Sequence, residues 1–394
     1  MIDFTFSDRD QKILDYVRSE SVAARKYARH YDENEHEFAP DELPEAANFP
    51  GVFAVMGKPG PEDSGPMVMG MLIAAGQTWG DYSVRVRRGR GAGLGNAALG
   101  ASGTAEQKAK WGPLLLAMAI TEPGCGSDPS LVQTSARLDE ATNEWVVNGE
   151  KIFVTTGCRA DGAVVWATLD KSAGRAGIKS FFIPKTAPGF IVAHKEKKLG
   201  IRADDTAAYV FKDCRIPRDH LLGGKEEIPR GGESGGFRDV MKTFNMTRPA
   251  TAAFGLGMSQ AALDFTREQL EAAGVDLAYG AGVHGKSAAA DRFQRLEALQ
   301  EAAMLTVLNA AWLSQNGKPN NLEASISKAK GGGAVREITQ GCIDLLGPLG
   351  VSREHLIEKW FRDVRITDIY EGTGQIQRLI IARTILDYGR GELK

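Results

Sequence analysis

The chain has 394 residues, with 48 basic and 50 acidic side chains and a formal net charge of −2. This balance argues against a protein whose main partner is nucleic acid or an anionic membrane. The length suffices for two or three domains with ample cores, and a hydrophobic content of 43% is ordinary for a globular enzyme. The start of the sequence is too charged for a signal peptide and no run of 18 apolar residues occurs, so we expect a cytoplasmic protein.

The cysteines and histidines form neither a disulfide framework nor a metal site. The four cysteines stand far apart without a CxxC pair, which argues against a zinc ribbon. The six histidines are scattered, without an HExxH or HxH motif. We therefore predict no metal cofactor.

Residues 1–117 read mainly as helix. Ser7 precedes an acidic first turn, which is a common start signal for a helix. The apolar residues expected on one face of this amphipathic surface helix are Ile13, Leu14, Val17 and Val22.

The pattern changes near residue 118, and residues 118–232 read as a β domain. Asn148-Gly149 stands between two β-rich runs, which is the strongest short signal for a hairpin. Further strand-like runs follow at 163–169, 178–184, 190–194 and 207–217. No helical stretch separates these runs, so the sheet is predicted to be antiparallel.

Helical periodicity returns after a glycine-rich junction at 223–236. Long stretches that are apolar on one face follow it, and the last helix candidate spans 374–388. The predicted fold class is α+β, with a helical domain at 1–117, a β domain at 118–232 and a second helical domain at 233–394.

Two glycine motifs resemble known sites only superficially. Residues 93–98 imitate a dinucleotide fingerprint, but the preceding run is basic and the following segment is short and polar, whereas a Rossmann unit needs a buried first strand. Residues 232–236 match GxSxG, but no strand precedes them as a nucleophile elbow requires. Both are interpreted as loops or junctions.

Two other segments carry groups suited to chemistry. Residues 118–128 combine an apolar run, a Thr hydroxyl, a turn with two glycines, and Ser and Asp. Such a loop can hold a heteroaromatic ring or its phosphates, although a domain junction would look the same. In residues 368–378, a carboxylate stands beside Tyr and Gly where an apolar helix opens. That carboxylate, Glu371, is either a catalytic base or a residue favoured by the helix dipole.

Together these segments resemble the acyl-CoA dehydrogenase family of flavoproteins. AITEPGCGSD (119–128) is similar to its first signature and RDVRITDIYEGTGQIQRLIIAR (362–383) to its C-terminal one. WVVNGEKIFVTTG (145–157) and KLGIRADDTAAYVFKDCRIP (198–217) fall between them in the family's order. The resemblance implies a helical N-terminal domain, a middle antiparallel β-barrel domain and a C-terminal four-helix bundle, with FAD between the middle and C-terminal domains.

The resemblance also implies roles for individual residues. It makes Glu371 the catalytic base. The implied cofactor-binding residues are Met118, Ala119, Ile120, Thr121, Gly126, Ser127, Phe153, Val154, Thr155, Gly347, Thr373 and Gln375. The implied substrate-binding residues are Ser127, Asn245, Arg248, Tyr370 and Gly372.

The implied reaction is the α,β-dehydrogenation of an acyl-CoA thioester to a trans-2-enoyl-CoA. A carboxylate desolvated by its ligand becomes an effective base for the Cα proton, and FAD accepts the hydride. The implied partners are the acyl-CoA and an electron-transfer flavoprotein, and the implied assembly is a homodimer or homotetramer. The alternatives are a relative with altered chemistry, such as an oxidase or desulfinase, and a non-catalytic subunit of a hetero-oligomer.

The sequence departs from the family pattern at several positions. Thr247 occupies the place where some members carry their base on a helix, and threonine cannot serve as one. The family's arginine that reaches a neighbouring subunit's FAD is matched here by Ala281, and Phe153 replaces the commoner Trp. Asp344 and Pro348 replace a usual Gln and Gly. These changes bear on FAD affinity and subunit arrangement more than on the reaction.

Overall fold

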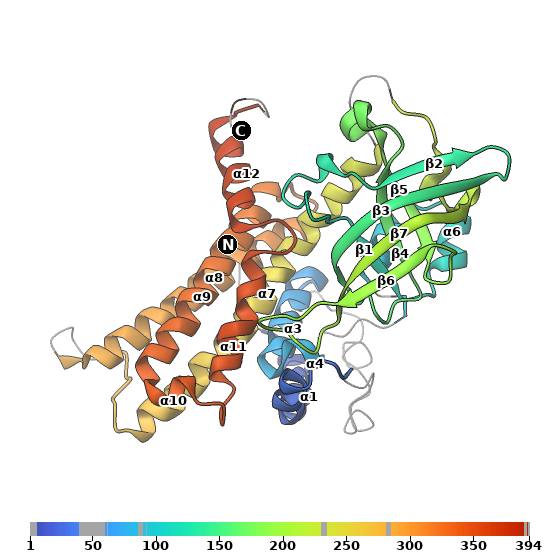
Figure 1. Ribbon diagram of the computed structural model, residues 1–394. Helices are drawn as coiled ribbons and strands as arrows, with labels where there is room; N and C mark the ends of the chain where they lie inside the picture. Colours follow the sequence, from blue (N-terminus) through green and yellow to red (C-terminus); the bar gives the residue numbers. More distant parts are fainter. Residues whose placement is uncertain are drawn as a thin grey trace. The chain divides into compact units, whose positions relative to one another are not determined.

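The computed structural model describes residues 6–38, 60, 62–85, 90–91, 93–229, 235–280, 285–389 and 392, with side chains throughout except at 84–85 and 235–246. The chain divides into two compact units (Figure 1). One unit comprises Met1–Val86, Lys198–Ala203 and Asn245–Lys394, and the other comprises Arg87–Lys197 and Asp204–Phe244. The three-domain division at 117/118 and 232/233 stays a prediction.

The second unit is built on a β-sheet. Within the described residues, its seven strands are β1 (Leu116–Ala119), β2 (Ser135–Asp139), β3 (Glu144–Thr155), β4 (Gly162–Thr168), β5 (Ile178–Pro184), β6 (Phe190–Lys195) and β7 (Thr206–Pro217). The order across the sheet is β1-β4-β2-β3-β7-β6, and β5 pairs with β4. The pairs β2–β3, β3–β7, β6–β7 and β4–β5 are antiparallel as predicted. Two pairings are parallel instead: β1 with β4, and β2 with β4 at a single bridge. Neither β1 nor β2 is joined to β4 by a hairpin.

The predicted turn at Asn148-Gly149 is wrong, since β3 runs through it without a break. The ladder to β7 shifts register between Val147 and Gly149, and the Asn148 side chain bonds Asp213 across the two strands. Gly149 has φ +145°, and a Cβ there would lie 2.5 Å from Thr134 Oγ1. Because β3 pairs with β7 on both sides of this dipeptide, Asn148-Gly149 forms a bulge and not a turn. The glycine leaves room for the backbone of Thr134 to lie close to it.

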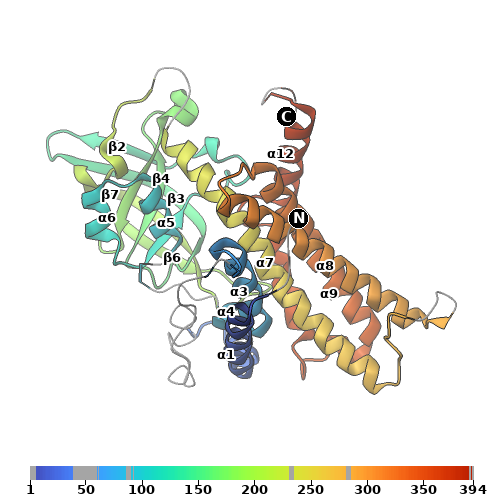
Figure 2. The ribbon, with the colours of Figure 1, turned by 180° about the vertical axis from the view of Figure 1, so that it is seen from behind.

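Both faces of β4 are covered, which explains its uninterrupted apolar sequence. Ala163 and Val165 face one buried cluster with Phe181, whereas Val164 and Trp166 face another. Helices α5 (Leu94–Ser102) and α6 (Ala105–Trp111) lie against that second face (Figure 2).

The glycines of the dinucleotide look-alike serve this packing of α5 on β1. A Cβ on Gly93 would lie 2.3 Å from the carbonyl oxygen of Leu116 in β1. A Cβ on Gly95 would lie 2.2 Å from the carbonyl oxygen of the next residue, Ala117. The close approach of helix and strand accounts for both glycines. The segment was predicted to be a loop, but the structure shows that it is the start of α5. The GxSxG segment lies largely outside the described residues.

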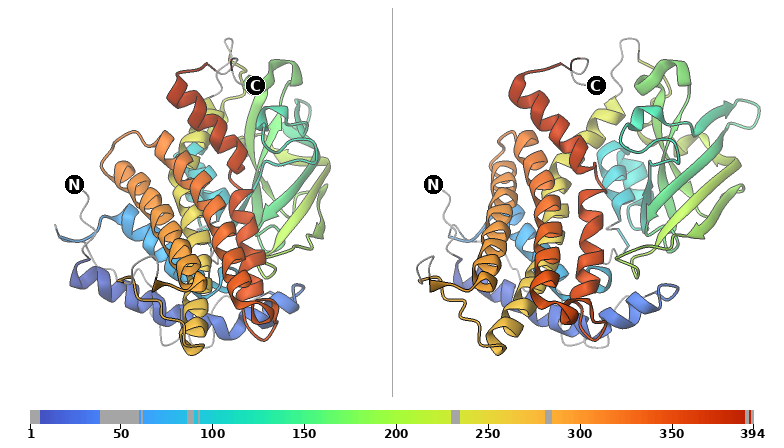
Figure 3. Two further views of the ribbon diagram at one scale, coloured as in Figure 1. Left: turned by 90° about the vertical axis from the view of Figure 1, so that its left-hand side faces the viewer. Right: turned by 60° about the vertical axis from the view of Figure 1, so that its left-hand side comes forward.

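The first unit is helical. Its elements are α1 (Asp8–Glu33), α3 (Pro66–Gly80), α4 (Tyr82–Arg85), α7 (Gly235–Ala272, which begins in the second unit), α8 (Ala288–Gln315), α9 (Asn321–Leu346), α10 (Pro348–Val351), α11 (Ile357–Asp363), the 3₁₀ turn η7 (Val364–Asp368) and α12 (Gly374–Leu386). Short 3₁₀ turns of the second unit span Pro129–Leu131, Lys171–Gly177, Arg218–His220 and Leu222–Gly224. The helices α8 and α9 lie side by side (Figure 3), and one apolar core joins them to α7 and α3.

The first helix begins as its sequence predicts. Ser7 is the N-cap, and its Oγ accepts a hydrogen bond from the Asp10 N–H at 3.1 Å. Ile13 and Val17 are fully buried, but Val22 is 50% exposed. Five residues beyond Val17 is about 140° around a helix, so the buried stripe continues through Ala24 instead.

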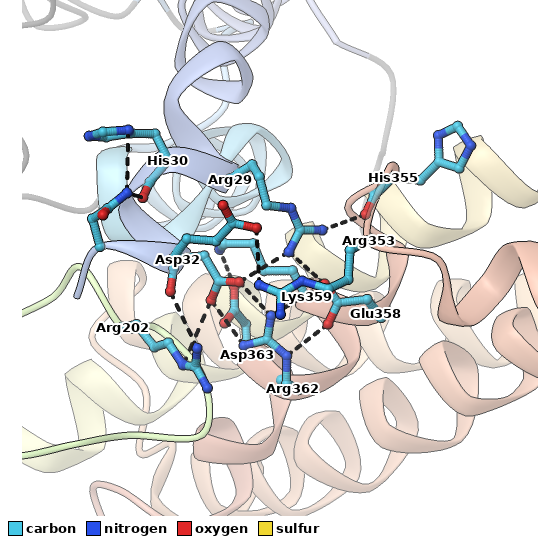
Figure 4. Close-up of polar contacts among 12 residues, drawn as sticks. Arg29, His30, Asp32, Arg202, Arg353, His355, Glu358, Lys359, Arg362 and Asp363 are labelled. Carbon is cyan, nitrogen blue, oxygen red and sulfur yellow. Dashed lines mark hydrogen bonds and ion pairs between the residues drawn. The ribbon is translucent and has the colours of Figure 1, made fainter.

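A buried ammonium holds α11 to the rest of the helical unit (Figure 4). Lys359 is 1% exposed, and its Nζ lies 2.5 Å from Asp81 Oδ2 and 2.5 Å from Asp363 Oδ2. Asp363 also accepts the Ile201 N–H at 2.6 Å, which ties the segment Lys198–Ala203 to the end of α11.

A second layer of ion pairs surrounds this ammonium (Figure 4). Arg362 binds both carboxylate oxygens of Asp32, at 2.9 and 2.6 Å, and donates to the carbonyl of Leu199. Arg29 donates to Glu358 at 2.6 Å. α11 leads directly into η7 and then into the segment that carries Glu371. This network therefore holds the N-terminal end of that segment in place.

Candidate active site

The first site segment leaves β1 in the sheet unit. Ala119 is fully buried in the core, so only its main chain is available to a ligand. The Thr121 carbonyl accepts the Ile152 N–H at 2.9 Å, which joins the exit of β1 to β3. The predicted residues 118–121 and 153–155 are thus held in one unit by backbone pairing.

A buried ion pair sits beneath this segment. Lys151 donates to the Ile120 carbonyl at 2.9 Å and to Glu122 Oε1 at 2.7 Å, and the two side chains are 0% and 5% exposed. Glu122 also accepts the N–H groups of Gln133 and Thr134, so it closes the glycine turn between residues 122 and 134. Burial would raise the pKa of Glu122, but Lys151 and these donors outweigh it and lower that pKa.

We expect Lys151→Met to destabilise the protein by about 3–5 kcal/mol, because it leaves the Glu122 carboxylate buried without its cation. Removal of Lys151 raises the folded pKa of Glu122 relative to the wild type, so the loss is largest near neutral pH and shrinks as Glu122 takes up a proton on acidification. Denaturant unfolding at pH 8 and pH 5 measures both effects. Lys171→Met, at an exposed position of the same unit, is the matched control. Equal stability of the two variants would refute a role for the pair.

The exposed part of this unit offers an aromatic ring and hydroxyl groups. Phe153 is 62% exposed and has φ +56°, where the β3–β7 ladder shifts register. A positive φ at a bulky residue is costly and is typical of functional positions. Ser127 and Gly126 are exposed in the glycine turn, Thr121 is partly exposed, and Val154 contributes only backbone because its side chain is buried.

These groups fit a flavin. A planar apolar-edged ring needs an aromatic neighbour and hydrogen-bond donors on its polar rim. A Cβ at Gly124 or Gly126 would meet nothing within 4 Å, so the turn leaves room for a ligand to approach its backbone.

The second site segment, in the helical unit, presents Glu371. This residue lies between η7 and α12 and has φ +55°, and Gly372 follows with φ +91°. L side chains rarely adopt the φ of Gly372, so the turn favours glycine at this position. Thr373 is the N-cap of α12, and its Oγ1 accepts the Ile376 N–H at 3.3 Å. The chain is thus bent so that one carboxylate-bearing residue is held in a strained conformation ahead of a helix.

Two buried cations from separate helices interact with the Glu371 carboxylate in this turn. Arg248 on α7 is 3% exposed; burial lowers its pKa, and the Glu371 carboxylate acts in the opposite direction. Lys328 on α9 is fully buried and interacts electrostatically with both Asp368 and Glu371. The structure therefore brings together the predicted residues Arg248, Tyr370 and Glu371.

Other predicted residues lie elsewhere or outside the description. Gly347 ends α9, fifteen residues after Gly332, whose Cα faces Asp368. This separation is about 22 Å along the helix axis, so Gly347 does not join the group around Glu371. Gln375 is exposed on the first turn of α12. Asn245 lies in α7 where side chains are not described, and Ala281 lies outside the described residues.

Sequence reasoning missed the buried lysines Lys151 and Lys328 and the acid Asp368. Lys328 lies on the buried face of α9 with Ala324 and Val335, at helical spacing. A lysine within an apolar stripe is the signal that could have found it. Among the described residues, no group of three His, Cys, Asp or Glu side chains could hold a metal ion, and no helix is both long and apolar enough to cross a membrane.

Comparison with known proteins identifies the family to which the chain belongs. Residues 117–214 match the model of the acyl-CoA dehydrogenase middle domain, and residues 234–386 match that of the acyl-CoA dehydrogenase C-terminal domain. The chain belongs to the acyl-CoA dehydrogenase family.

Individual relatives agree with this assignment. The mitochondrial short-chain specific acyl-CoA dehydrogenase of Mus musculus is 38% identical over 291 residues, which cover 72% of this chain and 67% of the relative. The short-chain specific acyl-CoA dehydrogenase of Clostridium acetobutylicum is 30% identical over 385 residues, covering 93% and 98%. The butyryl-CoA dehydrogenase structure from Megasphaera elsdenii superposes with a TM-score of 0.79 at 27% identity, covering 98% and 100%.

The comparisons confirm the predicted fold class, with helical N- and C-terminal parts and a middle β-sheet domain. They also confirm the predicted enzyme class and cofactor: the protein is an acyl-CoA dehydrogenase, an oxidoreductase acting on CH–CH bonds with FAD.

Proposed function

We propose that the protein dehydrogenates a short-chain acyl-CoA to its trans-2-enoyl-CoA, with Glu371 as the base that removes the Cα proton. The observation that supports this role is the strained turn at Glu371, whose carboxylate is surrounded by the buried cations Arg248 and Lys328. The preference for short chains rests on the relatives, several of which are short-chain specific enzymes.

In the proposed mechanism, the Glu371 carboxylate is ionised before an acyl-CoA binds. The incoming thioester excludes water from the turn, which makes the carboxylate a stronger base for a proton beside a carbonyl. A backbone N–H beside Glu371 donates to the thioester oxygen as negative charge develops there, an effect worth about 3–4 kcal/mol per donor. When bound, FAD supplies the hydride acceptor for the Cβ hydrogen.

The side chains of the sheet unit are assigned to the cofactor in this proposal. Thr121, Ser127 and Thr155 supply hydroxyl groups, and Phe153 supplies an aromatic face in place of the family's usual Trp. In the helical unit, Thr373 is already committed to capping α12 through Oγ1. Its contribution to cofactor binding therefore uses the remaining capacity of the hydroxyl or the main chain.

Electrons are proposed to pass to an electron-transfer flavoprotein, and the enzyme is proposed to act in the cytoplasm as a homodimer or homotetramer. Reduction of a purified electron-transfer flavoprotein by substrate and enzyme tests the acceptor. Sedimentation analysis tests the assembly.

The reaction is tested by anaerobic titration of the purified protein with acyl-CoA thioesters from four to sixteen carbons. We expect FAD to copurify, its absorbance to bleach fastest with the shortest chains, and the enoyl-CoA to appear in equal amount. Bound flavin that no thioester bleaches would contradict the dehydrogenase proposal. Failure of saturating FAD to bind or to raise the melting temperature would instead favour a non-catalytic subunit.

A further inference from the structure

Lys328 is a fully buried lysine for which the reaction as described has no direct use. It lies in the middle of α9, on the face that packs against η7, with Ala324 and Ser325 also buried beside it. Removing an ammonium from water costs several kcal/mol, so a lysine in this position needs compensating contacts.

Those contacts are all with the segment that carries Glu371. The Lys328 Nζ donates a hydrogen bond to the carbonyl oxygen of Thr367, which lies four residues before Glu371. The same Nζ lies 5.7 Å from the centre of the Tyr370 ring, the residue immediately before Glu371. One ammonium group from α9 therefore contacts both ends of the segment 367–370.

The charges around this group come from four elements. Burial, with a smaller contribution from Arg248 on α7, lowers the pKa of Lys328 to about 8, although the carboxylates of Asp368 and Glu371 act in the opposite direction. Arg336, about two helical turns further along α9, lies 3.5 Å from Asp368 Oδ2. On α12, Arg378 approaches Gly374 beside the Asp368 carboxylate. Asp368 is thus shared with Arg336, while Lys328 and Arg248 are the cations that interact with Glu371.

We propose that Lys328 is a positioning residue for Glu371: its hydrogen bond to the Thr367 carbonyl holds the turn, and its positive charge keeps the Glu371 carboxylate ionised. This inference rests on the proposed function, because ionisation of Glu371 matters for the rate only if that carboxylate is the base. Because its side chain is fully buried, Lys328 is assigned to positioning and not to contact with the substrate.

The test separates the charge of Lys328 from its hydrogen bond. Lys328→Arg keeps a cation, Lys328→Gln keeps a donor for Thr367 without the charge, and Lys328→Met removes both. Lys330→Met, at an exposed position of the same helix, is the matched control. For each FAD-loaded variant, the rate of flavin bleaching by butyryl-CoA is measured from pH 5 to pH 10.

Loss of a nearby positive charge raises the pKa of a carboxylate. In the Gln and Met variants, the rate is therefore expected to fall on the acidic side of the profile at a pH that is higher by roughly one unit or more; this acidic side is the acidic limb. The Arg variant and Lys330→Met are expected to leave that limb in place. A purely structural role would lower the melting temperature and the rate at every pH without moving the limb, and this result would overturn the proposal. An equal upward shift in Lys328→Arg would overturn it as well.

An infrared titration supplies a readout that does not depend on turnover. The band of the protonated Glu371 carboxyl group is identified by its loss in Glu371→Gln, and its midpoint is compared between the wild type and Lys328→Gln. An upward shift supports the electrostatic role, and an unchanged midpoint excludes it. If Glu371→Gln bleached at the normal rate, the proposed function would fail, whereas the infrared titration would still decide whether Lys328 controls Glu371.

Discussion

Replacing Lys359 by methionine is expected to lower the free energy of unfolding by at least about 3–5 kcal/mol, the cost of breaking a buried ion pair from one side. The ammonium is 1% exposed and lies between the carboxylates of Asp81 and Asp363. Burial opposes its charge, but the two carboxylates outweigh burial and raise the pKa of Lys359. Without it, two carboxylates would remain together in a site that also receives the Ile201 N–H.

Denaturant unfolding of the FAD-loaded protein measures this loss, with Lys330→Met as the exposed control. The triple variant Asp81→Asn, Lys359→Met, Asp363→Asn removes all three charges, so it is expected to recover much of the stability lost by Lys359→Met alone. A loss below about 1 kcal/mol in Lys359→Met would mean that the carboxylates are readily hydrated or protonated.

Periodicity and motif order were sufficient to predict most of the secondary structure. The strand-like run 178–184 coincides with β5, and the run 207–217 lies within β7 (Thr206–Pro217). The last helix begins at Gly374, where it was expected, because its apolar residues repeat at helical spacing. Asn148-Gly149 was misread because turn propensity is local, whereas the ladder between β3 and β7 is set by residues about sixty positions apart.

The candidate base was predictable from its motif, but its surroundings were not. Lys328, Lys151 and Lys359 are buried, although composition treats lysine as a surface residue. Each is explained by a partner distant in sequence: Lys359 and Asp81 are 278 positions apart, and Lys151 and Glu122 are 29 apart. Only the tertiary fold brings such partners together, so a single sequence shows the lysine but not the reason for its burial.

Changing Glu371 to glutamine is expected to slow flavin reduction by acyl-CoA by about 10²–10⁴-fold, the usual contribution of a general base. Glutamine keeps the size and much of the hydrogen bonding of glutamate, and it can occupy the same turn because Gly372 still supplies the left-handed residue that follows. Binding of acyl-CoA should stay within a few-fold, because Arg248 and Ser127, the residues that the family resemblance assigns to substrate binding, are unchanged. Rapid-mixing measurement of flavin bleaching and a separate binding titration with the product enoyl-CoA record the two quantities.

The alternative role for Glu371 is structural, as a carboxylate favoured ahead of α12 by the helix dipole. That role is worth about 1 kcal/mol of stability and nothing in catalysis. A variant that melts at a lower temperature but bleaches its flavin at the normal rate would therefore remove Glu371 from the reaction. Glu337→Gln makes the same chemical change at an exposed position of α9 and should alter neither property. Thr247→Glu in the Glu371→Gln background returns a carboxylate one residue before Arg248, and partial recovery of bleaching would show that the two positions reach the same Cα proton.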